Sequence, residues 1–298
     1  MKKRFAFTML ELLFVIVIMG ILGKFGVEFL ARAYDNFLFA KINDDLQSRS
    51  ASSVEFITKR LENRIKKSAS AFDPTTNTRT YIMGGVDVNA TVLEWIAAED
   101  DGFRGIQAPI WSGVIDLNLS NGTRLISPGS NFNDLDALIR VLSNNNSDIN
   151  DSAIYFIDAV FTSTNEWGYD NNPITDQVHA LHPVVEVNST TLASPAAPTN
   201  VDTFSGKEVS EYYKLSWTAN AVSLEDYNNT TNMGNLYFYY DYQPWQGETY
   251  LANGKKVLLA QGVNTFRFRS AGSLIKIQVC AKSRLTEEYA LCKEKTVF

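Results

Sequence analysis

The most constraining feature of the chain is an apolar run near its N-terminus. Residues 7–22 read FTMLELLFVIVIMGIL and carry a single charge, Glu11, whereas residues 1–6 read MKKRFA and carry three positive charges. The run is close to the length of a membrane-spanning helix, and the basic side should stay in the cytoplasm. We therefore expect a transmembrane part over residues 7–27, with the rest of the chain outside.

Glu11 separates three interpretations of this segment. A secretory signal would need a small-residue cleavage site directly after the apolar run, but Ala31-Arg32-Ala33 lies too far downstream. A plain single-span anchor would hold a carboxylate near the middle of the membrane, which costs roughly 2.5–3.5 kcal/mol on insertion scales. The third interpretation assigns a function to this carboxylate.

The segment resembles the class III signal of type IV pilins and pseudopilins. That family has a short basic leader, a small residue before the cut, Phe after it and Glu as the fifth residue of the mature chain; the matching residues are Ala6, Phe7 and Glu11. The family prefers Gly where this chain has Ala6. The resemblance implies that a prepilin peptidase removes a leader of residues 1–6. It also implies methylation of the new amino group and a single-pass protein of the bacterial inner membrane, with its head in the periplasm.

The resemblance also implies a role for Glu11 in assembly. Cleavage would create an α-ammonium group on Phe7, one helical turn from Glu11 and on the same face. A buried carboxylate needs a cation, and in the family the glutamate of an incoming subunit pairs with the amine of a neighbour. The implied partners are therefore other pilin or pseudopilin subunits and an inner-membrane assembly platform.

A long helix is expected to follow from the membrane segment. No proline occurs before Pro74, and apolar residues recur at steps of three or four as far as Phe72. One helix over residues 7–72 would be roughly 100 Å long at ~1.5 Å per residue. The serines at 48–53 favour a break, since their hydroxyls compete for backbone hydrogen bonds.

The rest of the chain divides, on its patterns, into a variable head region (73–200) and a C-terminal antiparallel β region (201–298). In the first we expect strands at 110–119 and 153–161, and a short helix that begins at Asn131 or Asn133. Residues 188–200 are rich in Ser, Thr, Ala and Pro and predict a linker or surface loop. The second region shows period-two alternation, which predicts a meander. The expected fold class is α+β and pilin-like, with the long helix packed on an enlarged sheet.

A second resemblance concerns the C-terminal region. Residues 257–279 read VLLAQGVNTFRFRSAGSLIKIQV and resemble the C-terminal sheet of larger minor pseudopilins of the type II secretion J kind. Residues 53–68 resemble the end of their helix. The resemblance implies a minor subunit of a type IV filament or type II secretion-like system, which would serve protein secretion or DNA uptake.

Charge and motifs narrow the function classes. The net charge is −6, and loss of the three leader cations leaves 24 basic against 33 acidic residues. Direct nucleic-acid contact is not expected, because it requires a basic face. The sequence has no nucleophile–histidine pair, phosphate loop or glycine fingerprint, so we expect a structural rather than an enzymatic role. The alternative is a membrane-anchored periplasmic enzyme or sugar-binding protein.

Candidate metal ligands are sparse, and no cofactor is expected. His179 and His182 form an HxxH without further histidines, and zinc needs more ligands than these two. The acidic turn 99–102 is the alternative, as a calcium loop, although it lacks the alternating oxygen ligands of an EF-hand. Asp170 and Asp176 are weaker candidates for calcium ligands of the same kind.

The two cysteines, Cys280 and Cys292, lie close together near the C-terminus. A lone close pair fits one disulfide in an exported domain, whereas two unrelated thiols would fit a cytosolic chain. The N-terminal segment favours export and hence the disulfide.

An acidic residue two positions before an N-x-[ST] sequon recurs along the head. The chain has 33 acidic residues, 25 Asn and 45 Ser or Thr, so random placement predicts about 0.4 such patterns. The pattern resembles the acceptor of bacterial periplasmic N-glycosylation. Asn188 and Asn228 lie in the most loop-like contexts. The alternative is a chain rich in polar surface loops. Five acceptors match: Asn89, Asn118, Asn150, Asn188 and Asn228.

Overall fold

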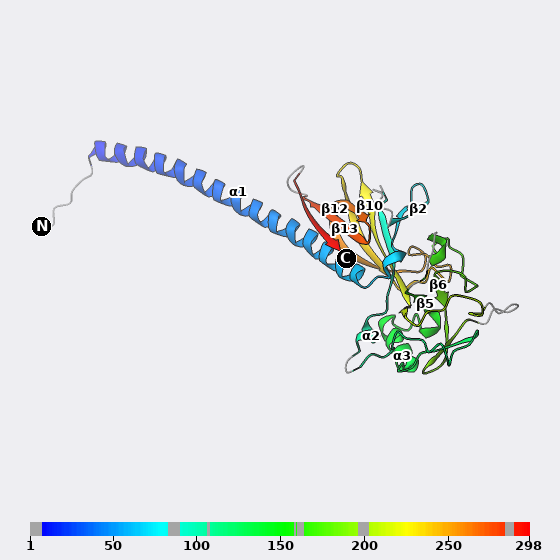
Figure 1. Cartoon of the computed structure of the whole chain (residues 1–298). Helices are drawn as coiled ribbons and strands as arrows, with labels where there is room; N and C mark the ends of the chain where they lie inside the picture. Colours follow the sequence, from blue (N-terminus) through cyan, green and yellow to red (C-terminus); the bar gives the residue numbers. More distant parts are fainter. Residues whose placement is uncertain are drawn as a thin grey trace.

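The protein has an α+β fold, in which one long N-terminal helix precedes a large antiparallel sheet and a second, smaller lobe (Figure 1). The computed structural model describes residues 8–82, 90–105, 108–157, 159, 164–195, 203–283 and 289–298.

The helix α1 spans Met9–Glu62, 54 residues, or about 80 Å at 1.5 Å per residue. Its N-terminal half projects away from the head, and its C-terminal half lies along the sheet (Figure 1). The predicted break at residues 48–53 is absent, so that prediction was wrong. The hydroxyls of Ser50 and Ser53 donate to the carbonyls of Leu46 and Arg49 at 2.8 Å, four residues back. The serines therefore bond within the helix and do not interrupt it.

The helix ends ten residues earlier than the prediction of 7–72. Asn63 caps it, and the chain then pairs with a strand: Ile65 N–H donates to Ile96 O at 3.0 Å, and Ala98 N–H donates to Asn63 O at 2.8 Å. These bonds replace the helical ones. A short 3-10 helix, η1 (Lys66–Ser68), and the first strand follow.

The main sheet has eight strands, and every neighbouring pair is antiparallel. The expected C-terminal meander is confirmed, and it extends through five consecutive strands. The strands, in sheet order, are β14 (Ala290–Val297), β13 (Leu274–Lys282), β12 (Lys255–Ala271), β11 (Met233–Tyr240), β10 (Thr218–Asn228), β3 (Val92–Ala97), β1 (Ser70–Asp73) and β2 (Thr78–Tyr81).

One face of this sheet packs against α1. Ile57 and Leu61 are completely buried, and the ring of Phe56 meets that of Phe238 on β11 at 5.0 Å, edge to face. The other face carries a core rich in aromatic residues, among them Trp167, Tyr239, Tyr242, Trp245 and Tyr250.

The smaller lobe has its own core and two three-stranded sheets, β4-β8-β7 and β6-β5-β9. Its strands are short and its helices are mostly single turns. Its elements are α2 (Asp101–Arg104), β4 (Arg124–Ile126), α3 (Phe132–Leu142), η3 (Ile149–Asp151), β5 (Ala153–Phe156), η4 (Thr164–Trp167), β6 (Leu181–Pro183), β7 (Val185–Asn188), β8 (Thr191–Ala193) and β9 (Tyr213–Ser216).

The two parts do not divide at residue 200. Strand β3, from the first predicted region, pairs with β10 inside the main sheet, and β9, from the second, pairs with β5 in the lobe. A buried polar contact joins the parts further. Lys255 Nζ lies 2.6 Å from an oxygen of Asp241, and Ser147 in the lobe donates to the same carboxylate at 2.6 Å.

The lobe tests three further predictions. The helix α3 is confirmed, and the side chain of Asn131 caps it. The expected strand at 110–119 was wrong: Gly113 has a φ of 72°, and the segment forms turns that bury Trp111 and Ile115. The segment 188–200 contains a strand, β8, before it leaves the described residues at 196.

Candidate functional site

The N-terminal half of α1 is apolar and uncovered. Every residue from 8 to 37 is exposed, and the most apolar window of 18 residues has a mean hydropathy of 2.2 with none of it buried. Contact with the head begins where the ring of Phe39 lies 5.2 Å from that of Tyr289, whose hydroxyl donates to Asn43 Oδ1 at 2.9 Å. The uncovered part is therefore about 45 Å long, more than the ~30 Å of a hydrocarbon core.

This geometry is compatible with a single-pass membrane protein. Among the described residues, α1 is the one helix that is long and apolar enough to cross a membrane. The first ion pair along it, between Glu28 and Arg32 at 2.7 Å, comes just after the expected transmembrane part at 7–27. That position fits the emergence of the helix into water.

Glu11 lies in the first turn of α1 and forms a reciprocal capping box with Thr8, the residue that caps the helix. The backbone N–H and the hydroxyl of Thr8 donate to Glu11 Oε2 at 3.1 and 3.0 Å, and the backbone N–H of Glu11 donates to Thr8 Oγ1 at 3.4 Å. Such a box satisfies backbone donors that would otherwise be unpaired at the helix start. This local role was not predicted from the sequence, although T-x-x-E before an apolar run is its signature. The processing residues Ala6 and Phe7 lie outside the described residues.

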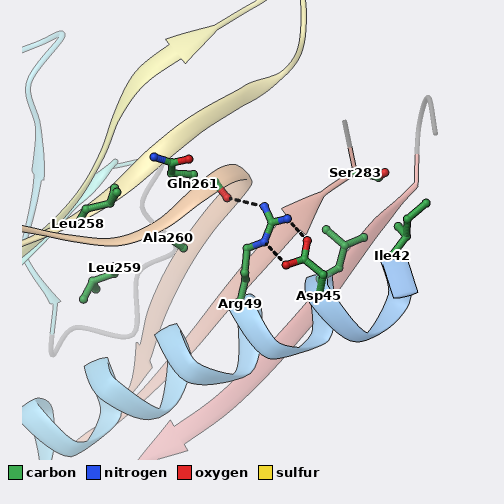
Figure 2. Close-up of a pocket in the computed structure, with 9 residues that line it drawn as sticks. Ile42, Asp45, Arg49, Leu258, Leu259, Ala260, Gln261 and Ser283 are labelled. Atoms are coloured by element: carbon green, nitrogen blue, oxygen red, sulfur yellow. Dashed lines mark hydrogen bonds and ion pairs between the residues drawn. The ribbon is translucent and has the colours of Figure 1, made fainter. Parts of the chain in front are cut away.

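A cleft of about 640 Å³ separates α1 from the first half of β12 (Figure 2). Arg49 spans it: its guanidinium pairs with Asp45 one turn away and donates from Nη1 to the carbonyl of Gln261 at 3.3 Å. The acid–base spacing of i and i+4 was visible in the sequence, but the contact with β12 was not.

The outer edge of β12 is open beside this cleft. Residues 255–263 pair with β11, whereas β13 pairs with β12 only from Val263 onward. Within the described part of the chain, no strand therefore lines the outer edge of residues 255–261. Val257 and Leu258 on this stretch are 42% and 43% exposed. Arg49 provides a side-chain donor for one carbonyl of that edge.

The two cysteines are joined. Cys280 and Cys292 form a disulfide between neighbouring strands, β13 and β14. The strand that it fixes, β14, also contacts α1: Lys295 Nζ lies 2.8 Å from Glu55 Oε2. The last strand of the head therefore has two attachments, one covalent and one to the helix.

The two histidines line the same pocket, but their rings contact different partners. Nδ1 of His179 lies 2.7 Å from Asp176 Oδ1, and Nδ1 of His182 lies 3.0 Å from Gln177 Oε1. Burial lowers the pKa of His182 to about 4, so the ring is neutral at neutral pH. It is therefore a packed, hydrogen-bonded side chain.

The acidic turn at 99–102 is occupied by donors of the protein itself. The Glu99 carboxylate is buried and accepts from the backbone of Gly102 at 2.7 Å and from the indole of Trp111 at 2.5 Å. Burial raises its pKa, against the effect of these donors. Asp100 pairs with Arg104 at 2.6 Å. Within the described ranges, no three or more His, Cys, Asp or Glu side chains come together in a group that could hold a metal ion. Asp170 therefore belongs to no such group.

Four of the five acceptor asparagines are described, and all four are exposed: Asn118, Asn150, Asn188 and Asn228. Asn89 lies outside the described residues. The other four lie in separate local elements: Asn118 is in a turn, Asn150 is in η3, Asn188 is the last residue of β7 and Asn228 is the last residue of β10.

No family model, curated protein or solved structure matches the chain.

Proposed function

We propose that the protein is a minor pilin-like or pseudopilin subunit of a type IV filament or a type II secretion-like system. The observation that carries the proposal is the division of α1. Its first 30 or so residues are uncovered and mostly apolar, and its second half is packed on an antiparallel sheet. Before assembly, a subunit of this shape can hold its apolar segment in the membrane. After assembly, it can bury the same segment among those of neighbouring subunits.

The assembly step rests on the exchange of partners at Glu11. In the isolated chain its carboxylate serves Thr8. In a filament it would pair with the α-ammonium group of a neighbouring subunit, made by peptidase cleavage between Ala6 and Phe7. A carboxylate inside the membrane is costly, and a close ion pair offsets that cost. The partners are then other subunits, the prepilin peptidase and the assembly platform.

The decisive experiment compares two substitutions of Glu11. A glutamine at the same position of a capping box still serves the helix start but carries no charge. We therefore expect Glu11→Gln and Glu11→Ala to insert into the membrane normally, and both to fall at least tenfold in the filament or pseudopilus fraction. Cross-linking of intact cells and fractionation of sheared filaments measure incorporation.

Normal incorporation of Glu11→Gln would contradict the charge exchange and would leave capping as the role of Glu11. Thr8→Ala is the matched control, since it weakens the capping box and keeps the carboxylate. We expect Thr8→Ala to assemble. If Thr8→Ala failed to enter the filament while Glu11→Gln entered it normally, the capping box and not the charge of Glu11 would be required for assembly, and the proposal would be wrong.

A further inference from the structure

The head carries more acid-extended sequons than chance provides, and the chain contains its own controls. Eight asparagines are followed two residues later by Ser or Thr, and five of these have Asp or Glu two positions earlier. With 33 acidic residues in 298, about one of eight would have one by chance. The three sequons without the acid are Asn121, Asn145 and Asn229.

Asn228 is the most accessible acceptor. It is the last residue of β10, at the start of the turn to β11, and residues 226–232 are all exposed. Its Oδ1 accepts from the backbone of Thr230 at 2.8 Å, so Nδ2 is left as the amide atom that can be modified. Asp226 accepts from Asn235 and Tyr237, both at 3.1 Å, and these hydrogen bonds lower its pKa. An ionised carboxylate is therefore displayed two residues before the acceptor.

Asn188 has the same local geometry at the end of β7. Its Oδ1 accepts from the backbone of Thr190 at 3.0 Å and from the Thr190 hydroxyl at 3.3 Å. Asn118 follows another pattern: its backbone N–H donates to Asp116 Oδ1 at 2.9 Å, in an exposed turn. Both side chains are exposed, and Ser120 and Thr190 are partly exposed.

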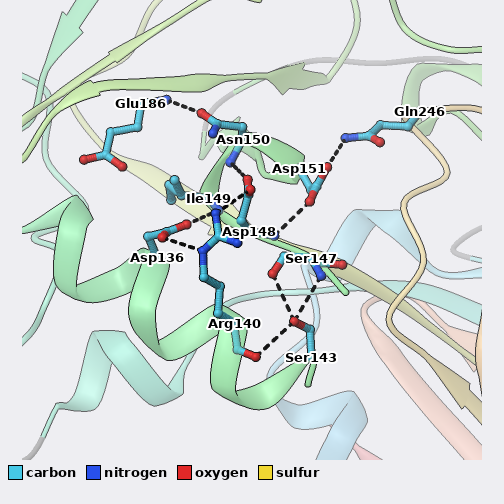
Figure 3. Close-up of polar contacts among 10 residues, drawn as sticks. All are labelled: Asp136, Arg140, Ser143, Ser147, Asp148, Ile149, Asn150, Asp151, Glu186 and Gln246. Carbon is cyan, nitrogen blue, oxygen red and sulfur yellow. Dashed lines mark hydrogen bonds and ion pairs between the residues drawn. The ribbon is translucent and has the colours of Figure 1, made fainter. Parts of the chain in front are cut away.

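Asn150 differs, because its sequon is built into the lobe (Figure 3). The hydroxyl-bearing residue of the sequon, Ser152, is only 1% exposed. The Asn150 amide oxygen accepts from the backbone of Glu186 at 2.9 Å, and Asp148 pairs with Arg140 at 2.7 Å. The fold thus buries the hydroxyl-bearing residue and engages the acceptor and the acid in contacts of its own.

We propose that the folded head is N-glycosylated at Asn228, Asn188 and Asn118, and not at Asn150. The enzyme would be a membrane-bound oligosaccharyltransferase acting outside the membrane, and the donor a lipid-pyrophosphate-linked oligosaccharide. Nδ2 attacks C1 of the first sugar, the C1–O bond to phosphate breaks, the lipid pyrophosphate leaves, and Nδ2 loses one proton to solvent. A cation of the enzyme would recognise the acid by a charge-assisted hydrogen bond.

The inference is independent of filament assembly, and it requires only that the head faces the side opposite to the basic leader. A glycan is bulky and needs an exposed acceptor, which the three sites supply. Asn121 is the matched control: its Oδ1 accepts from the backbone of Thr123 at 3.0 Å, as in Asn188 and Asn228, but Leu119 stands where those sites have an acid.

The test is site-resolved mass spectrometry of the full chain purified from its native host. We expect glycopeptides at Asn228, Asn188 and Asn118, with Asn150 and Asn121 bare. Asp226→Asn should reduce occupancy at Asn228 at least tenfold without disturbing the turn, since Asp226 has a φ of 53°, which asparagine tolerates.

A gain of modification gives the sharper result. Leu119 is 63% exposed, so Leu119→Asp costs no core contact. In an Asn118→Gln background this change should turn Asn121 into an acceptor. A chain with the mass of the bare polypeptide, or equal occupancy at Asn121 and Asn228 before any substitution, would overturn the inference. In either case the start of the mature chain, read in the same spectrum, still tests the pilin proposal separately.

Discussion

Cys280 on β13 lies directly opposite Cys292 on β14, and the disulfide between them joins the edge strand of the main sheet to its neighbour. The same edge strand packs along α1, where Lys295 pairs with Glu55. The strand that ends the described chain thus holds the helix to the head, and the disulfide fixes that strand.

Loss of the disulfide should weaken the head substantially. A cross-link that closes a loop of about 13 residues contributes on the order of 3 kcal/mol in the chain-entropy model. We expect the Cys280→Ser/Cys292→Ser variant to lose about that much unfolding free energy in urea. Lys295→Met is the control: it removes an exposed ion pair that solvent screens, and it should cost far less than loss of the disulfide. Free thiols in protein prepared without reductant would contradict this expectation.

Processing between Ala6 and Phe7 should be visible in the intact mass of the mature protein. The chain from a wild-type host should begin at Phe7, with one added methyl group, and a host without prepilin peptidase should accumulate the full precursor. The basic leader and the spacing of Phe7 and Glu11 motivate this expectation. A mature chain beginning at Tyr34, after Ala31-Arg32-Ala33, would identify a secretory signal instead.

An Ile→Ala substitution should destabilise the head in the second half of α1 but not in the first. Ile57 is 0% exposed, and Ile18 is 51% exposed. Ile57→Ala removes buried side-chain volume and should cost about 2–5 kcal/mol of unfolding free energy. Ile18→Ala should leave the unfolding of the head unchanged, within about 0.5 kcal/mol. Chemical denaturation in detergent, followed by Trp fluorescence, compares the two; an equal cost at both positions would refute the division.

The sequence predicted the long helix, α3 and the C-terminal meander because their apolar periods are long and regular. The end of α1 was missed, because Ile65, Ala69 and Phe72 continue the helical spacing while their backbone already belongs to the pairing with β3 and β2. Only long-range hydrogen bonds decide that boundary, and no local signal such as Gly or Pro precedes Pro74 after Gly26.

The interior charges could not be predicted either. Glu94 is 2% exposed and pairs with Arg79, and it also accepts from the hydroxyl of Tyr242 at 2.8 Å. These residues are far apart in the sequence and converge only through the strand order of the main sheet. The exposed acceptors such as Asn228 were predictable, since a sequon is local. The buried Ser152 within one such sequon was not, because burial depends on the lobe.

His182 should make the lobe sensitive to mild acid. Its ring is buried between Phe156 and Phe204, with centroids 5.0 and 6.0 Å away, and burial lowers its pKa from 6.5 to about 4. The unfolded chain then binds the proton more tightly than the folded one. The stability is complete above pH 6.5 and falls as the pH drops toward 4, by up to about 3 kcal/mol.

The substitution His182→Phe should remove this part of the pH dependence, because phenylalanine keeps the ring packing and cannot be protonated. We expect wild-type protein to lose about 2–3 kcal/mol more unfolding free energy than His182→Phe between pH 7.0 and 4.5, measured by urea denaturation. The control is His179→Gln, which removes the partly exposed histidine beside Asp176 and should retain most of the wild-type dependence. If His182→Phe lost as much stability on acidification as wild type, the carboxylates of the head, and not His182, would set its acid sensitivity.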